Sequence, residues 1–113
     1  MSYTPRPMEA ALKAIAEPNR RRILSLVKDE ELSAGEIASH FPLTRPAVSQ
    51  HLSVLKEAGL VHERRNGTRR MYIVRPEGFN EVKTFLETFW EEKLEALKRE
   101  AEREERRKRG KHD

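Results

Sequence analysis

The feature that most constrains the fold is residues 44–74, where a helix with clear ends is followed directly by a β-hairpin. Thr44 can cap the helix and Gly59 supplies a left-handed stop, which predicts a helix over about residues 45–58. Beyond it, β-branched and aromatic residues surround Asn66-Gly67, a dipeptide typical of tight hairpins.

The flanking sequence predicts four further helices. Apolar residues at helical spacing indicate helices over about residues 8–16 and 18–28, and Ser33 with Glu36 forms a capping box that begins a short helix ending near His40. A long helix begins near Phe79. The order predicts a mainly α fold with a small β-hairpin: a winged helix-turn-helix of about five helices and a two-stranded wing, with a long C-terminal dimerisation helix.

Charge is concentrated in the part that contains the hairpin. Residues 44–75 carry 7 basic and 2 acidic side chains, a net +5, whereas residues 76–97 carry 2 and 6, a net −4. The whole-chain charge of +4 hides this contrast. A compact basic block is expected where a protein contacts phosphates.

Composition excludes several classes of protein. With no Cys among 113 residues, the chain has no disulfide, thiolate metal site or cysteine nucleophile. The longest apolar run, Met71 to Val74, is far too short to span a membrane, and the N-terminus does not resemble a signal peptide, so we expect a cytoplasmic, nucleoid-associated protein. No nucleophile elbow, phosphate loop or metal-water site indicates an enzyme.

The helix over residues 45–58 has two faces. Val48, Leu52 and Leu55 cluster on one arc that must pack on the core, and the opposite arc carries short or hydrogen-bonding side chains. Such a face can approach base edges in the major groove, and Gln50 can read adenine through two hydrogen bonds. The predicted DNA-binding residues of this recognition helix are Thr44, Arg45, Ala47, Ser49, Gln50, His51, Ser53 and Lys56.

The hairpin, called the wing below (residues 61–74), carries four guanidinium groups, and we expect Glu63 to be the only acid near them. Such crowding of like charge opposes folding unless an anion relieves it. We therefore expect phosphate contact rather than a merely solvated surface. The predicted DNA-binding residues of the wing are Arg64, Arg65, Thr68, Arg69 and Arg70.

The C-terminal helix carries an apolar stripe followed by mixed charge. Apolar residues recur at steps of mostly three and four up to Ala101. Acid-first pairs such as Glu105 and Arg109 favour continued helix beyond Lys98. We expect a DNA-binding and dimerisation domain over residues 1–98, and over 99–113 a charged helical extension that frays to a disordered tail.

Two segments resemble the ArsR/SmtB family of bacterial repressors: residues 11–24, ALKAIAEPNRRRIL, and residues 48–61, VSQHLSVLKEAGLV, followed by the Arg-rich wing. The resemblance covers about residues 8–98. It implies a homodimeric repressor whose first and last helices form the dimer interface. The residues that fit this interface are Leu12, Ile15, Val82, Leu86, Phe89, Trp90, Leu94 and Leu97.

The chain departs from that family's metal sensors. Where they carry Glu-Leu-Cys-x-Cys-Asp-Leu-Ala, residues 31–38 read ELSAGEIA, with Ser33 and Gly35 in the Cys positions. The other common sensing site uses Asp and His pairs on the last helix, which here has no His before His112. We therefore predict no metal and no cofactor. Small-molecule binding at the dimer interface, control by a partner protein and constitutive autorepression stay open.

The main hypothesis is a metal-independent, homodimeric, sequence-specific transcriptional repressor that binds double-stranded DNA at an inverted-repeat operator. Its recognition helix enters the major groove, and its wing follows the backbone or the minor groove. The alternative is a nonspecific architectural nucleic-acid-binding protein that uses the wing and the charged extension without reading bases. A protein-interaction module would need an exposed apolar patch on the recognition helix, which the polar outer face does not offer.

Overall fold

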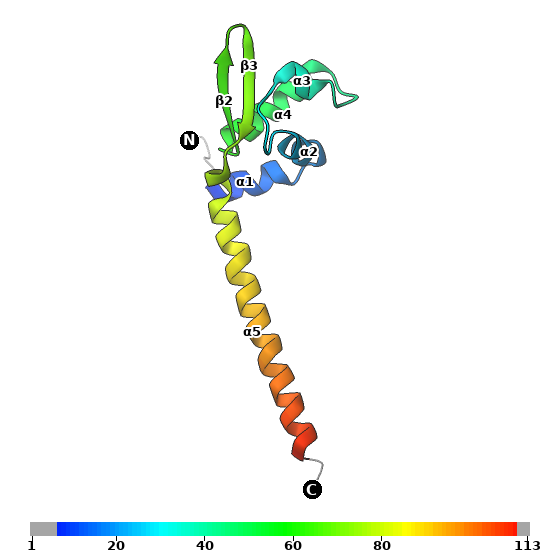
Figure 1. Ribbon diagram of the computed structural model, residues 1–113, viewed down its shortest axis with the longest axis vertical. Helices are drawn as coiled ribbons and strands as arrows, with labels where there is room; N and C mark the ends of the chain where they lie inside the picture. The colour runs from blue at the N-terminus through cyan, green and yellow to red at the C-terminus, as the bar shows by residue number, and fades with distance from the viewer. Residues whose placement is uncertain (1–6, 111–113) are drawn as a thin grey trace, which may run out of the picture. The chain divides into compact units, whose positions relative to one another are not determined.

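The computed structural model describes residues 7–110, and these form five α-helices, one 3₁₀ helix and a three-stranded sheet (Figure 1). Tertiary contacts separate the chain into two compact parts, one ending at Val82 and the other beginning at Lys83. The elements in chain order are α1 (Pro7–Ile15), α2 (Pro18–Leu26), β1 (Leu32–Ser33), α3 (Ala34–Ala38), α4 (Arg45–Glu57), β2 (Val61–Asn66), β3 (Arg69–Val74), η1 (Pro76–Phe79) and α5 (Asn80–Gly110). The predicted mainly α fold with a basic hairpin is confirmed.

The core lies between α1, α2, α3, α4 and the base of the sheet. Val48, Leu52 and Leu55 of α4 are buried, as their spacing predicts, and leave the opposite side of this helix to solvent. The largest fully buried side chains are Ile23, Val27, Ile37, Val48, Leu52, Leu55 and Leu60. A continuous apolar core thus holds α4 in place from behind.

Side-chain caps set where the helices begin. The Ser33 hydroxyl accepts from the Glu36 N–H at 3.1 Å and the Glu36 carboxylate accepts from the Ser33 N–H at 3.2 Å, which is the predicted capping box. The Thr44 hydroxyl caps α4 by accepting from the Ala47 N–H at 3.2 Å. Gly59, with φ of +75°, ends the turn after α4.

The sheet has one strand more than the sequence predicts. Its order is β1-β3-β2, and both pairs are antiparallel, with Leu32 opposite Tyr72 and Ser33 opposite Met71. Two residues are too few to show strand periodicity, so only tertiary pairing identifies β1. The wing is therefore fastened along β3 to the segment that begins α3.

The turn of the wing is shifted by one residue from the Asn66-Gly67 signal. Asn66 pairs with Arg69, which leaves Gly67 and Thr68 as the two-residue loop. Only Gly67 has a positive φ, +67°, which favours a glycine at the first central position of the turn. The register places Arg64 and Arg69 on one face of the hairpin, and Arg65 and Arg70 on the other.

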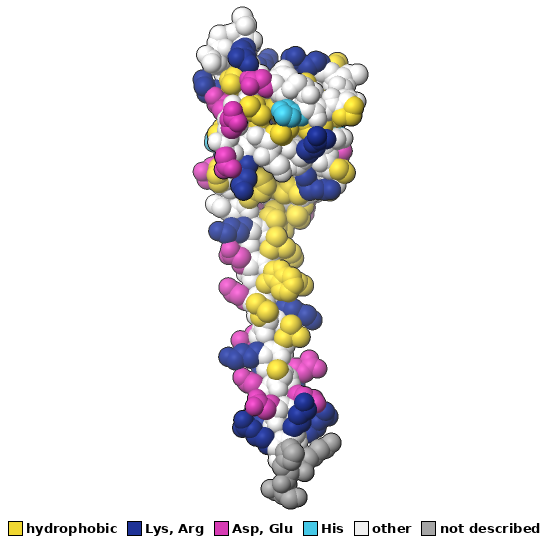
Figure 2. Space-filling model, turned by 45° about the vertical axis from the view of Figure 1, so that its right-hand side comes forward, with side chains coloured by type: hydrophobic (Ala, Val, Ile, Leu, Met, Phe, Trp, Pro, Cys, Tyr) yellow, Lys and Arg dark blue, Asp and Glu magenta, His cyan; other side chains and the backbone are white. Residues whose placement is uncertain are grey.

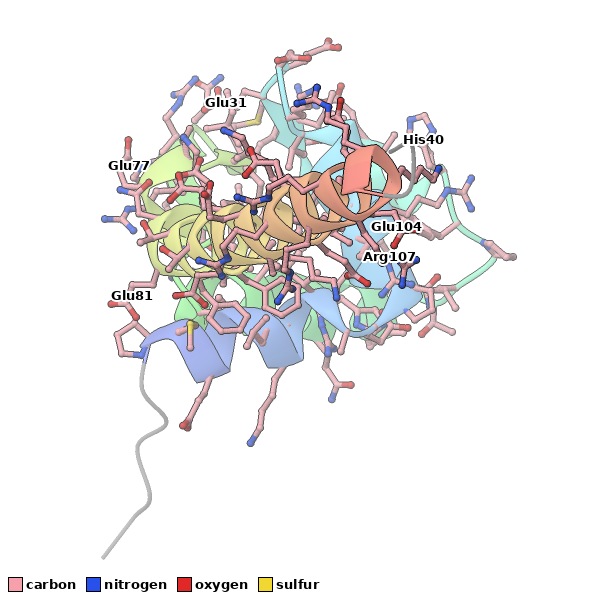
Figure 3. The ribbon with its side chains drawn as sticks, turned by 90° about the horizontal axis from the view of Figure 1, so that it is seen from below. Glu31, His40, Glu77, Glu81, Glu104 and Arg107 are labelled. Atoms are coloured by element: carbon pink, nitrogen blue, oxygen red, sulfur yellow. The ribbon has the colours of Figure 1, made fainter. Side chains whose placement is uncertain are left out.

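The helix α5 continues through the charged extension to Gly110. Arg109 donates to Glu105 at 3.0 Å, as predicted, and Arg107 donates to Glu104 at 2.6 Å one turn apart (Figure 3). The end of the expected fraying tail, residues 111–113 with His112, lies outside the described residues. Within residues 7–110, no helix has the length and apolar character needed to cross a membrane.

Candidate nucleic-acid interface

The outer face of α4 carries polar side chains without partners, together with one exposed apolar side chain, Val54. Ser49, Gln50 and Ser53 are exposed, and within residues 7–110 their side chains form no hydrogen bond with the protein. Their donors and acceptors are therefore available to a ligand without breaking internal contacts. The predicted neighbours Arg45 and Ala47 lie in the first turn, exposed and half-buried respectively.

A groove of about 780 Å³ separates α4 from the wing. Arg45, Arg69 and Arg70 bring three guanidinium groups to it, accompanied by hydroxyl groups and by one carboxylate, that of Glu36. Its lining residues are Ser33, Ala34, Gly35, Glu36, Ser39, Arg45, Ser49, Ser53, Thr68, Arg69, Arg70 and Tyr72. The groove joins residues predicted on the recognition helix to residues predicted on the wing, and its chemistry suits anionic oxygens.

The arginines of the wing are less free than the sequence indicates. Arg64 donates to both carboxylate oxygens of Glu31, at 2.8 and 2.5 Å. Arg69 donates to Glu36 at 2.6 Å and to the Ser33 hydroxyl at 3.0 Å. The expectation that Glu63 is the only nearby acid is wrong, because the fold brings in carboxylates from more than 30 positions earlier in the chain.

On the other face of the wing, Arg70 lies 4.0 Å from Glu63, and Arg65 has no ion pair among the described residues. Glu63 accepts from the Tyr72 hydroxyl at 2.7 Å and from Lys56 at 3.3 Å. The Tyr72 hydrogen bond, aided by Lys56 and Arg70 and opposed by partial burial, lowers the pKa of Glu63 below its usual range. The Lys56 ammonium, a predicted DNA contact, is thus tied to the wing.

His51 faces the protein rather than the groove. Its Nδ1 lies 3.4 Å from Arg20 Nη1 and 3.8 Å from a carboxylate oxygen of Glu17, and its side chain is 20% exposed. Desolvation raises the pKa of Glu17, but the hydrogen bond from the Arg20 backbone N–H and the nearby His51 outweigh it. The pKa of Glu17 is therefore lowered below its usual range. His51 therefore joins α4 to the start of α2, where Glu17 is the N-cap.

Comparison with known proteins supports a single assignment for this geometry. Residues 17–63 match the family described as "Bacterial regulatory protein, arsR family". The chain is 45% identical over 87 residues to the HTH-type transcriptional regulator Rv2034 of Mycobacterium tuberculosis, covering 77% of this chain and 81% of that protein. The chain belongs to the ArsR family.

Other ArsR-family comparisons agree. The transcriptional repressor SdpR of Bacillus subtilis is 43% identical over 60 residues, which cover 53% of this chain and 67% of that protein. The solved structure of an ArsR-like transcriptional regulator from Rhodococcus sp. RHA1 superposes with a TM-score of 0.70 at 27% identity, covering 85% of this chain and 91% of that one. The chain is a DNA-binding transcriptional regulator and not an enzyme.

In this ArsR-family chain, Ser33 and Gly35 occupy the positions that hold cysteines in the family's metal sensors, and both residues have other roles. Ser33 is buried, and its hydroxyl caps α3 and accepts from Arg69. Gly35 has no side chain, and a Cβ there would lie 3.3 Å from Arg45. Within residues 7–110, no group of three or more His, Asp or Glu side chains is arranged to hold a metal ion.

The predicted dimer residues fall into two groups. Five predicted apolar side chains of α5, together with Phe85, which was not predicted, are 47–58% exposed and lie along one side of the helix (Figure 2), and Leu12 of α1 is also exposed. We call this set the α5 stripe: Phe85, Leu86, Phe89, Trp90, Leu94 and Leu97. The prediction of Val82 as an interface residue is wrong, because Val82 is only 8% exposed and packs in the core of its own chain, and Ile15 is half-buried.

Sequence reasoning missed Phe85, Glu31 and Glu36 as parts of these surfaces. Phe85 is 53% exposed, and the centroid of its ring lies 6.4 Å from that of the Phe89 ring. The two residues are four positions apart, so the helical spacing of apolar residues could have identified Phe85. No local pattern marks the two glutamates, because their partners are 33 residues away in the chain.

Proposed function

We propose that the chain is a homodimeric, sequence-specific transcriptional repressor that works without a metal and binds inverted-repeat DNA in the bacterial cytoplasm. Its α4 helix enters the major groove, and the wing follows the backbone or the minor groove. The observation that carries this proposal is the groove between α4 and the wing, which brings the unpaired hydroxyl groups of Ser49 and Ser53 together with cationic side chains, while Gln50 lies exposed next to Ser49 on the same helix. Groups that can contact bases and groups that can bind phosphates thus lie close together on one surface.

The recognition-helix assignment is supported by what α4 lacks. Its exposed side has no carboxylate before Glu57, so no negative charge opposes entry between two phosphate backbones. Gln50 has the amide that adenine pairs with through its N6 and N7 positions. Its neighbours Ser49 and Ser53 are short enough for the helix backbone to come close to the bases.

Dimerisation is supported by the width of the α5 stripe. At about 100° per residue, side chains from Phe85 to Ala101 cover an arc of about 180°, wider than a core-facing stripe of about 100°. A face this apolar and this exposed marks an interaction surface. A second copy of α5, with Leu12 of α1 contributing, provides a matching apolar surface by symmetry.

Metal independence is supported by the chemistry at positions 33 and 35. The Ser33 hydroxyl already accepts hydrogen bonds from the Glu36 N–H and from Arg69, at 3.1 and 3.0 Å. A neutral hydroxyl and a glycine cannot replace the thiolates that soft metal ions require. Repressor activity should therefore respond to a signal other than a thiolate-bound metal.

The test is binding of the dimer to duplex DNA from its own promoter, compared with a random duplex of equal length. We expect Gln50→Ala to lower operator affinity by about 5- to 150-fold per subunit and to leave random-duplex affinity nearly unchanged, because bidentate base contacts are worth about 1–3 kcal/mol each. Thermal melting of Gln50→Ala serves as the control for folding. An architectural DNA-binding protein would instead lose almost no affinity with Gln50→Ala.

A further inference from the structure

Two of the four arginines of the wing already donate hydrogen bonds to carboxylates of the same chain. Arg64 pairs with Glu31 through two hydrogen bonds, and Arg69 pairs with Glu36 at 2.6 Å. These are charge-assisted hydrogen bonds, the same kind that a DNA phosphate would form with these groups. A DNA phosphate and a glutamate carboxylate would therefore compete for the same guanidinium donors.

The two carboxylates flank β1, the short strand that pairs with β3. Glu31 precedes β1, and β1 pairs with the centre of β3 through Leu32 and Ser33. Glu36 lies in the first turn of α3 and is fixed by its own bond to the Ser33 N–H. Since Arg64 and Arg69 lie on the same face of the hairpin, the one segment over residues 31–36 supplies a carboxylate to each of them.

Glu36 stands inside the proposed DNA-binding groove, together with Arg69. The Ser33 side-chain and backbone hydrogen bonds, aided by Arg69, lower the pKa of Glu36, so the carboxylate is ionised at neutral pH. The charge is not needed for the cap, because a capping box accepts Gln as well as Glu at this position. A negative charge in a phosphate-binding groove thus has a consequence separate from folding.

We propose that Glu36, with Glu31 in support, limits the DNA affinity of this protein by competing with phosphate for the arginines of the wing. The inference rests on the proposed function, since it assumes that the wing meets DNA. Phosphate contacts carry no sequence information, so the competition reduces operator binding and random-duplex binding by the same factor. Base recognition by α4 is then the main source of discrimination between operator DNA and random DNA.

The test compares Glu36→Gln with wild type by fluorescence anisotropy, on operator and random duplexes, across 50–200 mM salt. We expect Glu36→Gln to bind both duplexes about two- to fivefold more tightly per subunit, the range of an exposed ion pair. Freeing one phosphate contact should also increase the loss of affinity across this salt range by about three- to fourfold per subunit. Thermal melting checks that the capping box survives.

Two matched variants separate competition from other causes. Glu30→Gln removes the same charge from an exposed position with no ion pair among the described residues, and it should change affinity less than Glu36→Gln. In an Arg69→Gln background, Glu36→Gln should lose most of its effect. Glu31→Gln should repeat the gain through Arg64 without touching the capping box.

Each other outcome overturns the proposal. If Glu36→Gln weakens binding, Glu36 positions Arg69 for DNA instead of competing for it. If the gain persists without Arg69, or if Glu30→Gln matches it, the effect is general electrostatics. If wild-type protein shows no salt-dependent DNA binding, the proposed function itself fails, which is a different result from a null effect of Glu36→Gln on a protein that does bind.

Discussion

Replacement of Leu94 by Ala tests whether the α5 stripe holds two subunits together. Leu94 is 58% exposed in the single chain, and full burial of a Leu side chain is worth about 1.5–3 kcal/mol, so burial of its exposed part contributes about 0.9–1.7 kcal/mol per subunit. Twofold symmetry doubles this to about 1.7–3.5 kcal/mol per dimer. The dimer dissociation constant should rise about 20- to 350-fold.

Analytical ultracentrifugation over a wide concentration range measures this constant. Alanine is the best helix former, so Leu94→Ala should leave α5 helical, which circular dichroism can check. The matched control is Thr88→Ala, which lies on the opposite side of α5 and should leave the dimer constant within about twofold. A change smaller than about threefold for Leu94→Ala, or a wild-type chain that stays monomeric at all concentrations, would refute the role of the stripe.

Two further predictions concern stability. Ser33→Ala removes the N-cap of α3 and should lower the free energy of unfolding by about 1 kcal/mol or more. Scanning calorimetry should then show a Tm about 4–8 °C lower than that of wild type. An unchanged Tm would show that Arg69 and Glu36 hold this segment without the hydroxyl. Burial, aided by Glu63, raises the pKa of Tyr72 from 10.0 to about 12, so the neutral phenol contributes stability that is fully present below pH 10 and is lost as the pH rises from about 10 to 12. Urea midpoints should therefore fall more steeply over that interval for wild type than for Tyr72→Phe, and parallel curves would contradict the assignment.

Local signals were sufficient for most of the fold. The capping residues Ser33 and Thr44, the stop at Gly59 and the period of Val48, Leu52 and Leu55 each act within one or two helical turns. Such short-range physics can be read from sequence alone. The exposed face of α4 follows directly, because the side of a helix opposite its buried residues must meet solvent.

Long-range pairing was not predictable in the same way. The strand β1 is only two residues long, and its partner in β3 lies about 40 positions later in the chain. The same pairing brings Glu31 to Arg64 and Glu36 to Arg69, so the prediction of unrelieved positive charge on the wing was wrong for the same reason that β1 was missed. Charge counts along a sequence cannot show which carboxylate the fold places beside a guanidinium.

The contacts of His51 show, for a single residue, the same limit of predicting long-range contacts from sequence. Its position in α4 made it a predicted DNA contact, yet its Nδ1 lies near Arg20 and Glu17 of the neighbouring helix segment. Helical periodicity places it at the border between the buried and exposed arcs of α4, where neighbouring elements decide the direction of the side chain. Its place in DNA binding stays a prediction.

The central claim is that α4 reads base sequence while the wing binds the backbone. Its most direct test is the ratio of wild-type affinities for an inverted repeat from the chain's own promoter and for a random duplex of equal length, measured at about 150 mM salt. Direct readout by two recognition helices predicts a ratio of roughly 10³ or more. A ratio near one, with binding that depends steeply on salt, would contradict the claim.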